Sequence, residues 1–159
     1  MMNPENQEKW RALLGRHYEQ QILEEYSKYL KTPADKDSLL SYEDTKRLVE
    51  AKADAFPPPW FRTTVPFQDM WKVKEFIQKN VQYKDDSFYI YTIDGYCQLR
   101  QYKIQSLSLL NLDFPFDTGN GLLVLTSCNM KEEISIDWYD LSDDLYIDLE
   151  LSNADKESL

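Results

Sequence analysis

Carboxylates crowd one stretch near the end of the chain, and they are the residues with the most obvious chemistry. From Glu132 to Glu150 the sequence has eight acidic residues and no lysine or arginine. A protonated and an ionised carboxyl group together hydrolyse glycosides, and clustered aspartates hold magnesium in phosphoryl chemistry. A carboxylate-based hydrolase is therefore one interpretation of this segment. The other is a solvated strand face with a turn, where aspartate is common for conformational reasons.

Other catalytic and metal-binding patterns are absent from the sequence. It contains no phosphate-binding glycine loop and no G-x-S-x-G motif, and the acidic residues lack the spacing of an EF-hand. His17, the single histidine, has no assisting Asp or Cys pattern and is expected to be structural or superficial. Cys97 and Cys128, with no C-x-x-C pair, indicate buried free thiols and exclude structural zinc. We therefore predict no enzymatic activity, no cofactor and no metal.

The acidic stretch has the pattern of two β-strands joined by an acidic loop. Apolar residues alternate with polar ones over 134–138 and again over 145–151. Period-two alternation predicts strands with one face buried and one face in water. The wet face and the loop carry the residues that we take as the candidate partner-binding site: Asp137, Tyr139, Asp140, Asp143, Asp144, Tyr146, Asp148 and Glu150.

The net charge of −10 is confined to one half of the chain. Residues 1–83 contain 13 basic and 13 acidic residues, whereas residues 84–159 contain 5 basic and 15 acidic residues. A negative field repels nucleic acid and anionic membranes and attracts basic proteins. The sequence therefore predicts a basic protein partner, with no nucleic-acid and no membrane binding.

Three helices are expected in the first half. Asn3–Lys31 begins with an N-cap candidate followed by proline, carries an apolar stripe at helical spacing, and should end before Pro33. Ser41–Ala55 begins with a capping-box pattern and has a thin apolar face, so it should lie on the surface. Phe67–Asn80 has a wide apolar face, with Asn80 as a possible left-handed cap. Pro57–Pro59 is expected to form a rigid extended connector before this third helix.

The second half is expected to form a sheet. Phe88–Ile93 and Tyr96–Ile104 flank Asp94-Gly95, a dipeptide typical of a two-residue hairpin turn. Leu122–Cys128 is continuously apolar, as expected for a central strand that is covered on both faces. Helices followed by strands favour an α+β fold. We predict three N-terminal helices packed on a four- to five-stranded antiparallel sheet formed by the C-terminal half.

Length and composition predict one domain. With 159 residues the chain can bury a substantial core, and division at the prolines would leave two marginal pieces. The expected organisation is a helical part at about 3–80, a sheet part at about 87–151 and a frayed tail at 152–159. No apolar run approaches the length of a membrane helix, and MMNPENQEKW lacks the features of a signal peptide. A cytoplasmic location is the resulting expectation.

The acidity, the small size and the lack of catalytic motifs together resemble the small acidic immunity proteins of bacterial toxin systems. Such proteins are cytoplasmic and neutralise basic nuclease toxins by covering a functional surface. The resemblance implies an inhibitor that occludes a basic partner, here through the strands of 132–150. The alternatives are the carboxylate-based hydrolase, with its acids at 137–150, and a structural subunit of a larger assembly.

Overall fold

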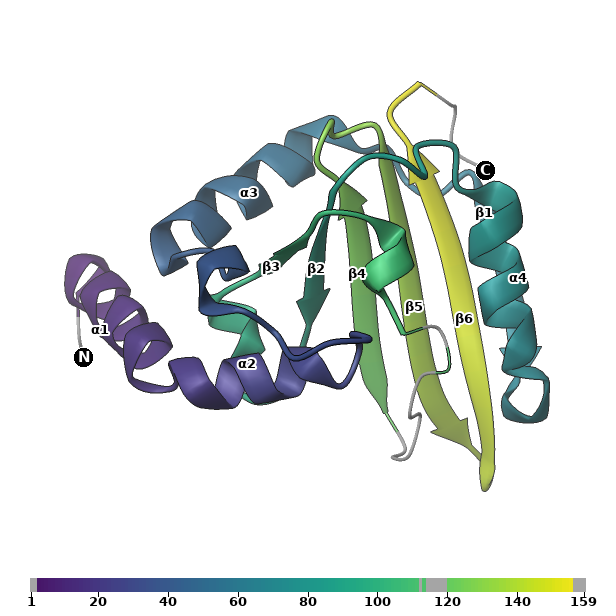
Figure 1. Ribbon diagram of the computed structural model, residues 1–159, viewed down its shortest axis with the longest axis horizontal. Helices are drawn as coiled ribbons and strands as arrows, with labels where there is room; N and C mark the ends of the chain where they lie inside the picture. The colour runs from purple at the N-terminus through teal and green to yellow at the C-terminus, as the bar shows by residue number, and fades with distance from the viewer. Residues whose placement is uncertain (1–2, 112, 114–119, 156–159) are drawn as a thin grey trace.

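A computed structural model describes residues 3–111, 113 and 120–155 (Figure 1). Within these ranges the chain forms four α-helices and a six-stranded antiparallel sheet of order β1-β6-β5-β4-β2-β3. The helices lie mostly in the first half and the strands mostly in the second. The predicted α+β fold is therefore confirmed, with one more helix and at least one more strand than expected.

The predicted helix over Asn3–Lys31 is two helices, α1 (Pro4–His17) and α2 (Glu19–Ser27). Asn3 caps α1 as expected, because its side-chain oxygen accepts the N–H of Asn6 at 2.8 Å. The break falls at Tyr18, whose ring stacks on Tyr96 with centroids 3.9 Å apart. Just before it, the Arg100 guanidinium donates to the Gly15 carbonyl at 3.2 Å. These two contacts accompany the change of direction, which the continuous apolar stripe did not reveal.

The other two predicted helices are present with altered ends. Helix α3 (Tyr42–Ala55) is capped by Ser41, whose hydroxyl accepts the N–H of Asp44 at 3.0 Å, so the predicted cap is confirmed. Helix α4 (Trp71–Asn80) begins after a separate 3₁₀ turn at Phe67–Asp69. Asn80 is not a left-handed cap; it is the last helical residue, and its amide donates to the Phe76 carbonyl at 3.0 Å.

Strand β1 (Phe61–Pro66) was missed by the sequence prediction. It pairs antiparallel with β6 at the edge of the sheet, in a register that places Val65 opposite Ile147. Val65 is the only buried residue of β1, and the sequence FRTTVP lacks the alternation of apolar and polar residues that marks a half-buried strand. Its proline is tolerated because an edge strand has one unpaired side.

The predicted hairpin pairs correctly but has the wrong connection. Strands β2 (Phe88–Thr92) and β3 (Tyr102–Ile104) are antiparallel neighbours. Between them the chain makes a 3₁₀ turn, Cys97–Leu99, instead of a two-residue turn. The hydroxyl of Tyr26 donates to the Cys97 and Arg100 carbonyls at 3.2 and 2.6 Å. Helix α2 therefore holds this longer connection in place.

The two cysteines lie beside strands of the sheet, and β4 runs through its centre. Both cysteines are free, as predicted, but Cys97 lies buried in the 3₁₀ turn and Cys128 is half-buried directly after β4. Strand β4 (Gly121–Ser127) is nearly continuously buried, which confirms the prediction of a central strand covered on both faces.

The acidic stretch forms a long hairpin, β5 (Glu132–Leu141) and β6 (Asp144–Asn153). The predicted acidic loop is wrong: the connection is a two-residue turn, and Asp140 and Asp144 belong to the strands. Strand β6 also extends through Asn153, so residues 152 and 153 are not a frayed tail. Residues 156–159 of the predicted tail lie outside the described part.

The turn at Ser142-Asp143 should be improvable. Both residues have positive φ, at 54° and 70°, which a two-residue turn of this type requires and which favours Asn-Gly. Side chains with a Cβ are strained in this conformation. Ser142→Asn with Asp143→Gly should therefore raise the free energy of unfolding by about 1 kcal/mol. A urea titration with an unchanged slope would establish the gain, and an unchanged midpoint would contradict it.

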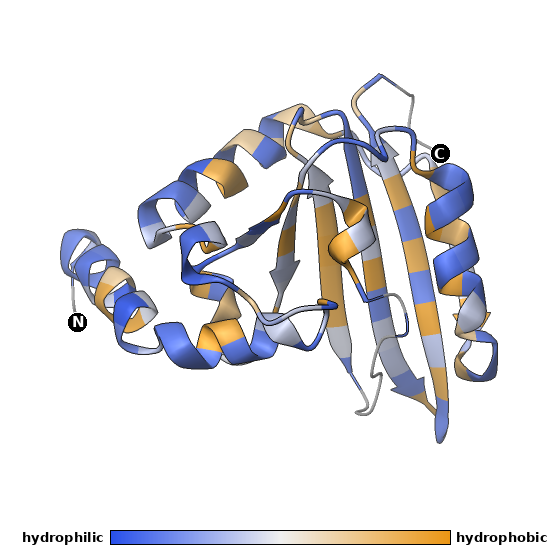
Figure 2. Cartoon of the chain, in the orientation of Figure 1, coloured by the Kyte–Doolittle hydropathy of each residue, from blue (hydrophilic) through white to orange (hydrophobic). Residues whose placement is uncertain are grey.

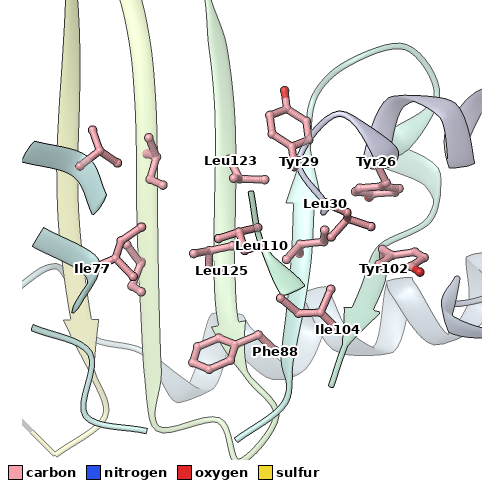
Figure 3. Packing of buried hydrophobic residues seen from close by; sticks show 14 of the residues in the cluster. Tyr26, Tyr29, Leu30, Ile77, Phe88, Tyr102, Ile104, Leu110, Leu123 and Leu125 are labelled. Atoms are coloured by element: carbon pink, nitrogen blue, oxygen red, sulfur yellow. The ribbon is translucent and has the colours of Figure 1, made fainter. Parts of the chain in front are cut away.

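The hydrophobic core lies between one face of the sheet and helices α2 and α4. Apolar residues alternate along β5 and β6 (Figure 2) and point toward the same side as the central residues of β4 and β2. Tyr26 and Leu30, in and just after α2, and Ile77 of α4 close over this face together with Leu110 (Figure 3). The buried apolar side chains form one cluster, whose members are spread along the sequence from Ile22 to Leu151.

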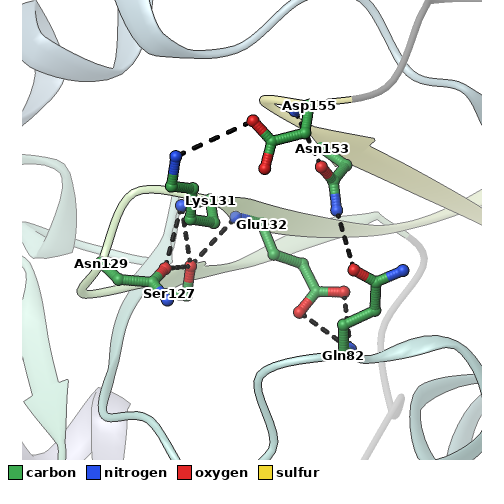
Figure 4. A network of polar contacts seen from close by, with 7 residues as sticks. All are labelled: Gln82, Ser127, Asn129, Lys131, Glu132, Asn153 and Asp155. Atoms are coloured by element: carbon green, nitrogen blue, oxygen red, sulfur yellow. Dashed lines mark hydrogen bonds and ion pairs between the residues drawn. The ribbon is translucent and has the colours of Figure 1, made fainter.

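A buried carboxyl group joins the start of β5 to the segment after α4 (Figure 4). Glu132 has no exposed surface. Its oxygens accept the Gln82 N–H at 3.0 and 3.1 Å and the Tyr83 N–H at 3.2 Å. Its own N–H donates to the Ser127 hydroxyl at 3.0 Å. Glu132 is therefore a structural acid and does not belong to the solvent-facing acidic cluster.

Candidate partner-binding face

The second face of the sheet is only partly covered. Helix α3 lies over it, where Lys52 pairs with Glu133 at 3.0 Å between nitrogen and oxygen. The hydroxyl of Thr126 donates to the same carboxylate at 2.9 Å. This contact is largely shielded from solvent, since the Lys52 and Glu133 side chains are only 16% and 22% exposed. Helix α3 therefore anchors to the sheet near the start of β5, away from the hairpin turn.

Toward the turn, side chains of β5 and β6 form what we call the acidic face. The pairing register places Asp137 opposite Asp148 and Tyr139 opposite Tyr146. Side chains two residues apart in a strand share a face. The acidic face therefore consists of six of the eight predicted site residues: Asp137, Tyr139, Asp144, Tyr146, Asp148 and Glu150.

Asp140 and Asp143 do not belong to this face. Asp140 follows Tyr139 in β5, so its side chain projects to the opposite side of the sheet, beyond the end of the core; its N–H donates to Asn120 Oδ1 at 3.3 Å. Asp143 is a turn residue. Both were included because a longer loop was expected, and the shorter turn separates them from the other six.

The acidic face is ordered by its own hydrogen bonds. Asp148 Oδ1 accepts the hydroxyl of Thr64 at 2.7 Å and that of Tyr139 at 3.2 Å. The rings of Tyr139 and Tyr146 lie 6.1 Å apart at 30°. At the other end of the face, Glu150 pairs with Arg62 at 3.2 Å. Neighbouring side chains of the sheet therefore position Asp148, Tyr139 and Glu150.

Thr64 and Arg62 were missed as contributors to this face because β1 was not predicted. The run Thr63-Thr64-Val65 is rich in β-branched residues and was the available signal for a strand. The proline that ends it and the three prolines before it obscured that signal.

Asp137 is the strained member of the acidic face. Among the described residues it has no hydrogen-bond or ion-pair partner through its carboxylate, and it faces Asp148 directly. Desolvation by neighbouring atoms, followed by repulsion from Asp148, raises its pKa above the usual value of 3.8. Like charges directly opposite on neighbouring strands destabilise a sheet.

Asp137→Asn should therefore stabilise the protein at neutral pH, by about 0.5 kcal/mol because the exposed repulsion is screened by solvent. A raised folded-state pKa means that the folded protein holds this proton more tightly than the unfolded chain. The contribution of Asp137 to wild-type stability should fall as pH rises from 3.8 through the raised pKa. The advantage of the variant should appear over that window and vanish below it. Thermal melts of both proteins between pH 3 and 7 would test this, and a pH-independent difference would contradict it.

A groove borders the acidic face. Its volume is about 500 Å³. One wall is formed by Pro57–Pro59 and the end of α3, and the other by Glu133, Ser135 and Glu150 of the sheet. The triple proline therefore acts as a connector that forms one wall, as its stiffness predicts. Asp137 and Asp148 are not part of this lining, so the facing carboxylates lie on the open sheet and outside the groove.

The comparisons with known proteins give no relative: no family model, no curated protein and no solved structure matches the chain. Within residues 3–111, 113 and 120–155, no three or more His, Cys, Asp or Glu side chains are grouped so as to hold a metal ion. The helices of the same residues include none with the length and apolarity needed to span a bilayer.

Proposed function

We propose that the protein binds a basic protein through the acidic face and thereby blocks a functional surface of that partner. The observation that supports this most strongly is the Asp137–Asp148 pair. Two carboxylates face each other on an uncovered part of the sheet, at a cost in stability that a purely structural surface does not require. Proteins commonly retain such costly features at sites where function needs them.

The surroundings of the pair suit protein recognition. Tyr139 and Tyr146 present large aromatic surfaces with polar hydroxyls, the residue type that dominates binding energy at interfaces. Neighbouring carboxylates steer a positively charged partner and increase its association rate. The most concrete form of this function is a bacterial inhibitor of a basic nuclease toxin. Such an inhibitor would act in the cytoplasm, and its acidic face would cover a basic surface of the toxin.

The structure allows a matched test of this proposal. Asp137→Asn, Asp144→Asn and Asp148→Asn together remove three charges from the acidic face, and asparagine at 148 still accepts hydrogen bonds. Asp54→Asn, Asp140→Asn and Asp143→Asn remove the same charge from exposed positions outside it. Each protein would serve as bait in a low-salt lysate of the native host, with bound proteins eluted by a salt gradient and identified by mass spectrometry.

One basic protein retained by wild type and by the Asp54 control set, and lost from the acidic-face set, is the expected result. With the captured protein purified, association should slow by at least about tenfold for the acidic-face set, since electrostatic steering acts on this rate. Equal retention by all three baits would sink the proposed interface. A hydrolase remains the alternative, and glycan hydrolysis abolished by the same three substitutions would support it.

A further inference from the structure

A basic cavity lies on the helical side of the molecule, on the opposite side of the sheet from the acidic face. Its volume is about 350 Å³, within the range of small-molecule sites. Among the described residues the lining includes three lysines, Lys31 after α2, Lys74 on α4 and Lys84 after α4, and one carboxylate, that of Asp113. Among the described residues, none of the three ammonium groups forms an ion pair. Three exposed lysines from separate segments thus line one cavity of an acidic protein.

The rest of the described lining combines apolar side chains with the polar residues Gln78, Ser108 and Asn111. Ile77, Leu107 and Leu110 contribute hydrocarbon surface, and Ile77 and Leu110 belong to the buried core. The Lys31 N–H donates to the Leu109 carbonyl at 2.9 Å, and the Asn111 N–H donates to the Tyr29 carbonyl at 2.8 Å. These bonds tie the chain after α2 to the 3₁₀ turn Leu107–Leu109, which lies between α2 and α4 (Figure 1). These two hydrogen bonds therefore fix the backbone along one wall of the cavity.

We propose that this cavity binds a small organic anion in which a phosphate, sulfonate or carboxylate group is joined to an apolar body. The lysines would bind the charged group, and the leucine and isoleucine surface would bind the apolar part. The negative net charge of the whole protein limits how many negative charges the ligand can carry. A net charge of −10 repels nucleic acid and other polyanions at long range. A compact anion with one or two charges is repelled far less and can reach the lysines.

The proposal can be tested with a fluorescent probe of this chemistry, 8-anilinonaphthalene-1-sulfonate. The folded wild-type protein should bind it at one saturable site, and the affinity should fall as salt is added. The neutral analogue N-phenyl-1-naphthylamine has the same aromatic body without the sulfonate and should bind at least tenfold more weakly. Equal binding of the two probes would show a merely apolar cavity and overturn the proposal.

Lysine substitutions provide the second arm. Lys31→Gln, Lys74→Gln and Lys84→Gln together should weaken sulfonate binding about tenfold or more, since three charge contacts are lost. Lys36→Gln, Lys79→Gln and Lys131→Gln change the net charge equally at positions outside the lining and should leave the affinity within twofold. Circular dichroism would confirm that both variants are folded. Equal weakening in both sets would mean that only overall charge matters, and the cavity would then not be a site.

Discussion

Replacing Glu132 by glutamine should lower the free energy of unfolding by about 3 kcal/mol. The carboxyl group is fully buried, and both of its oxygens accept backbone N–H groups from Gln82 and Tyr83. Glutamine has one acceptor oxygen, and its NH₂ group would face a backbone donor. A buried donor without an acceptor costs about 1–3 kcal/mol, and the lost hydrogen bond to a charged group adds to this. Urea denaturation at pH 7 would measure the loss.

Glu133→Gln is the matched control for this prediction. It changes the same residue type at the next position, on the other face of the sheet, where the side chain pairs with Lys52 and remains in partial contact with water. We expect a smaller loss there, of about 1–2 kcal/mol, because glutamine can still accept the Thr126 hydroxyl and Lys52 keeps some contact with water. Equal losses for the two variants would contradict the structural role assigned to Glu132, as would a Glu132→Gln protein within 0.5 kcal/mol of wild type.

Gly121→Ala should be the most disruptive single-methyl substitution in the sheet. Gly121 lies opposite Trp138, and a Cβ at position 121 would clash with the indole ring. Trp138 is almost entirely buried and packs near Tyr29, so the ring cannot move without displacing the core. Overpacking of this kind costs about 3 kcal/mol. Thermal melting and a change in tryptophan fluorescence would report the substitution.

A substitution of Trp138, the residue with which the new methyl group would clash, provides the control. Trp138→Phe removes the ring atoms that a methyl group at 121 would strike, at the cost of some packing. In the double variant, Gly121→Ala should therefore cost less than it does with Trp138 present, by more than about 1 kcal/mol of coupling. Additive losses in the double-mutant cycle would show that the destabilisation has another origin.

Local patterns predicted much of the fold. The helix caps at Asn3 and Ser41 act within three residues, so the sequence alone was sufficient to locate them. The helix break at Tyr18 was not predictable in this way, because the contacts beside it come from Tyr96 and Arg100, about 80 residues away. Strand β1 was missed for a related reason. It is held mainly by its pairing with β6, and only one of its own side chains is buried.

The candidate site was predicted to the extent that strand periodicity determines side-chain direction. Alternation alone was sufficient to place Asp137, Tyr139, Tyr146 and Asp148 on one face, and the register confirms that placement. The turn length decides the direction of the residues beside it, so Asp140 was misplaced once a longer loop was expected. Whether the acidic face binds a partner is a question that periodicity does not address and that the matched aspartate variants would answer.

The pairing of β1 with β6 has a consequence for the order in which the molecule can assemble. Residues paired between the two strands are 80 to 90 positions apart in the sequence, with α4, β2, β3, β4 and β5 between them. During synthesis β1 leaves the ribosome long before β6 exists, and its backbone groups must wait for that partner. Such distant pairing slows folding, whereas the hairpin β5–β6 can close locally as soon as it is made. We expect β1 to join the sheet last, so that the nascent chain is most vulnerable to aggregation while β6 is still being translated.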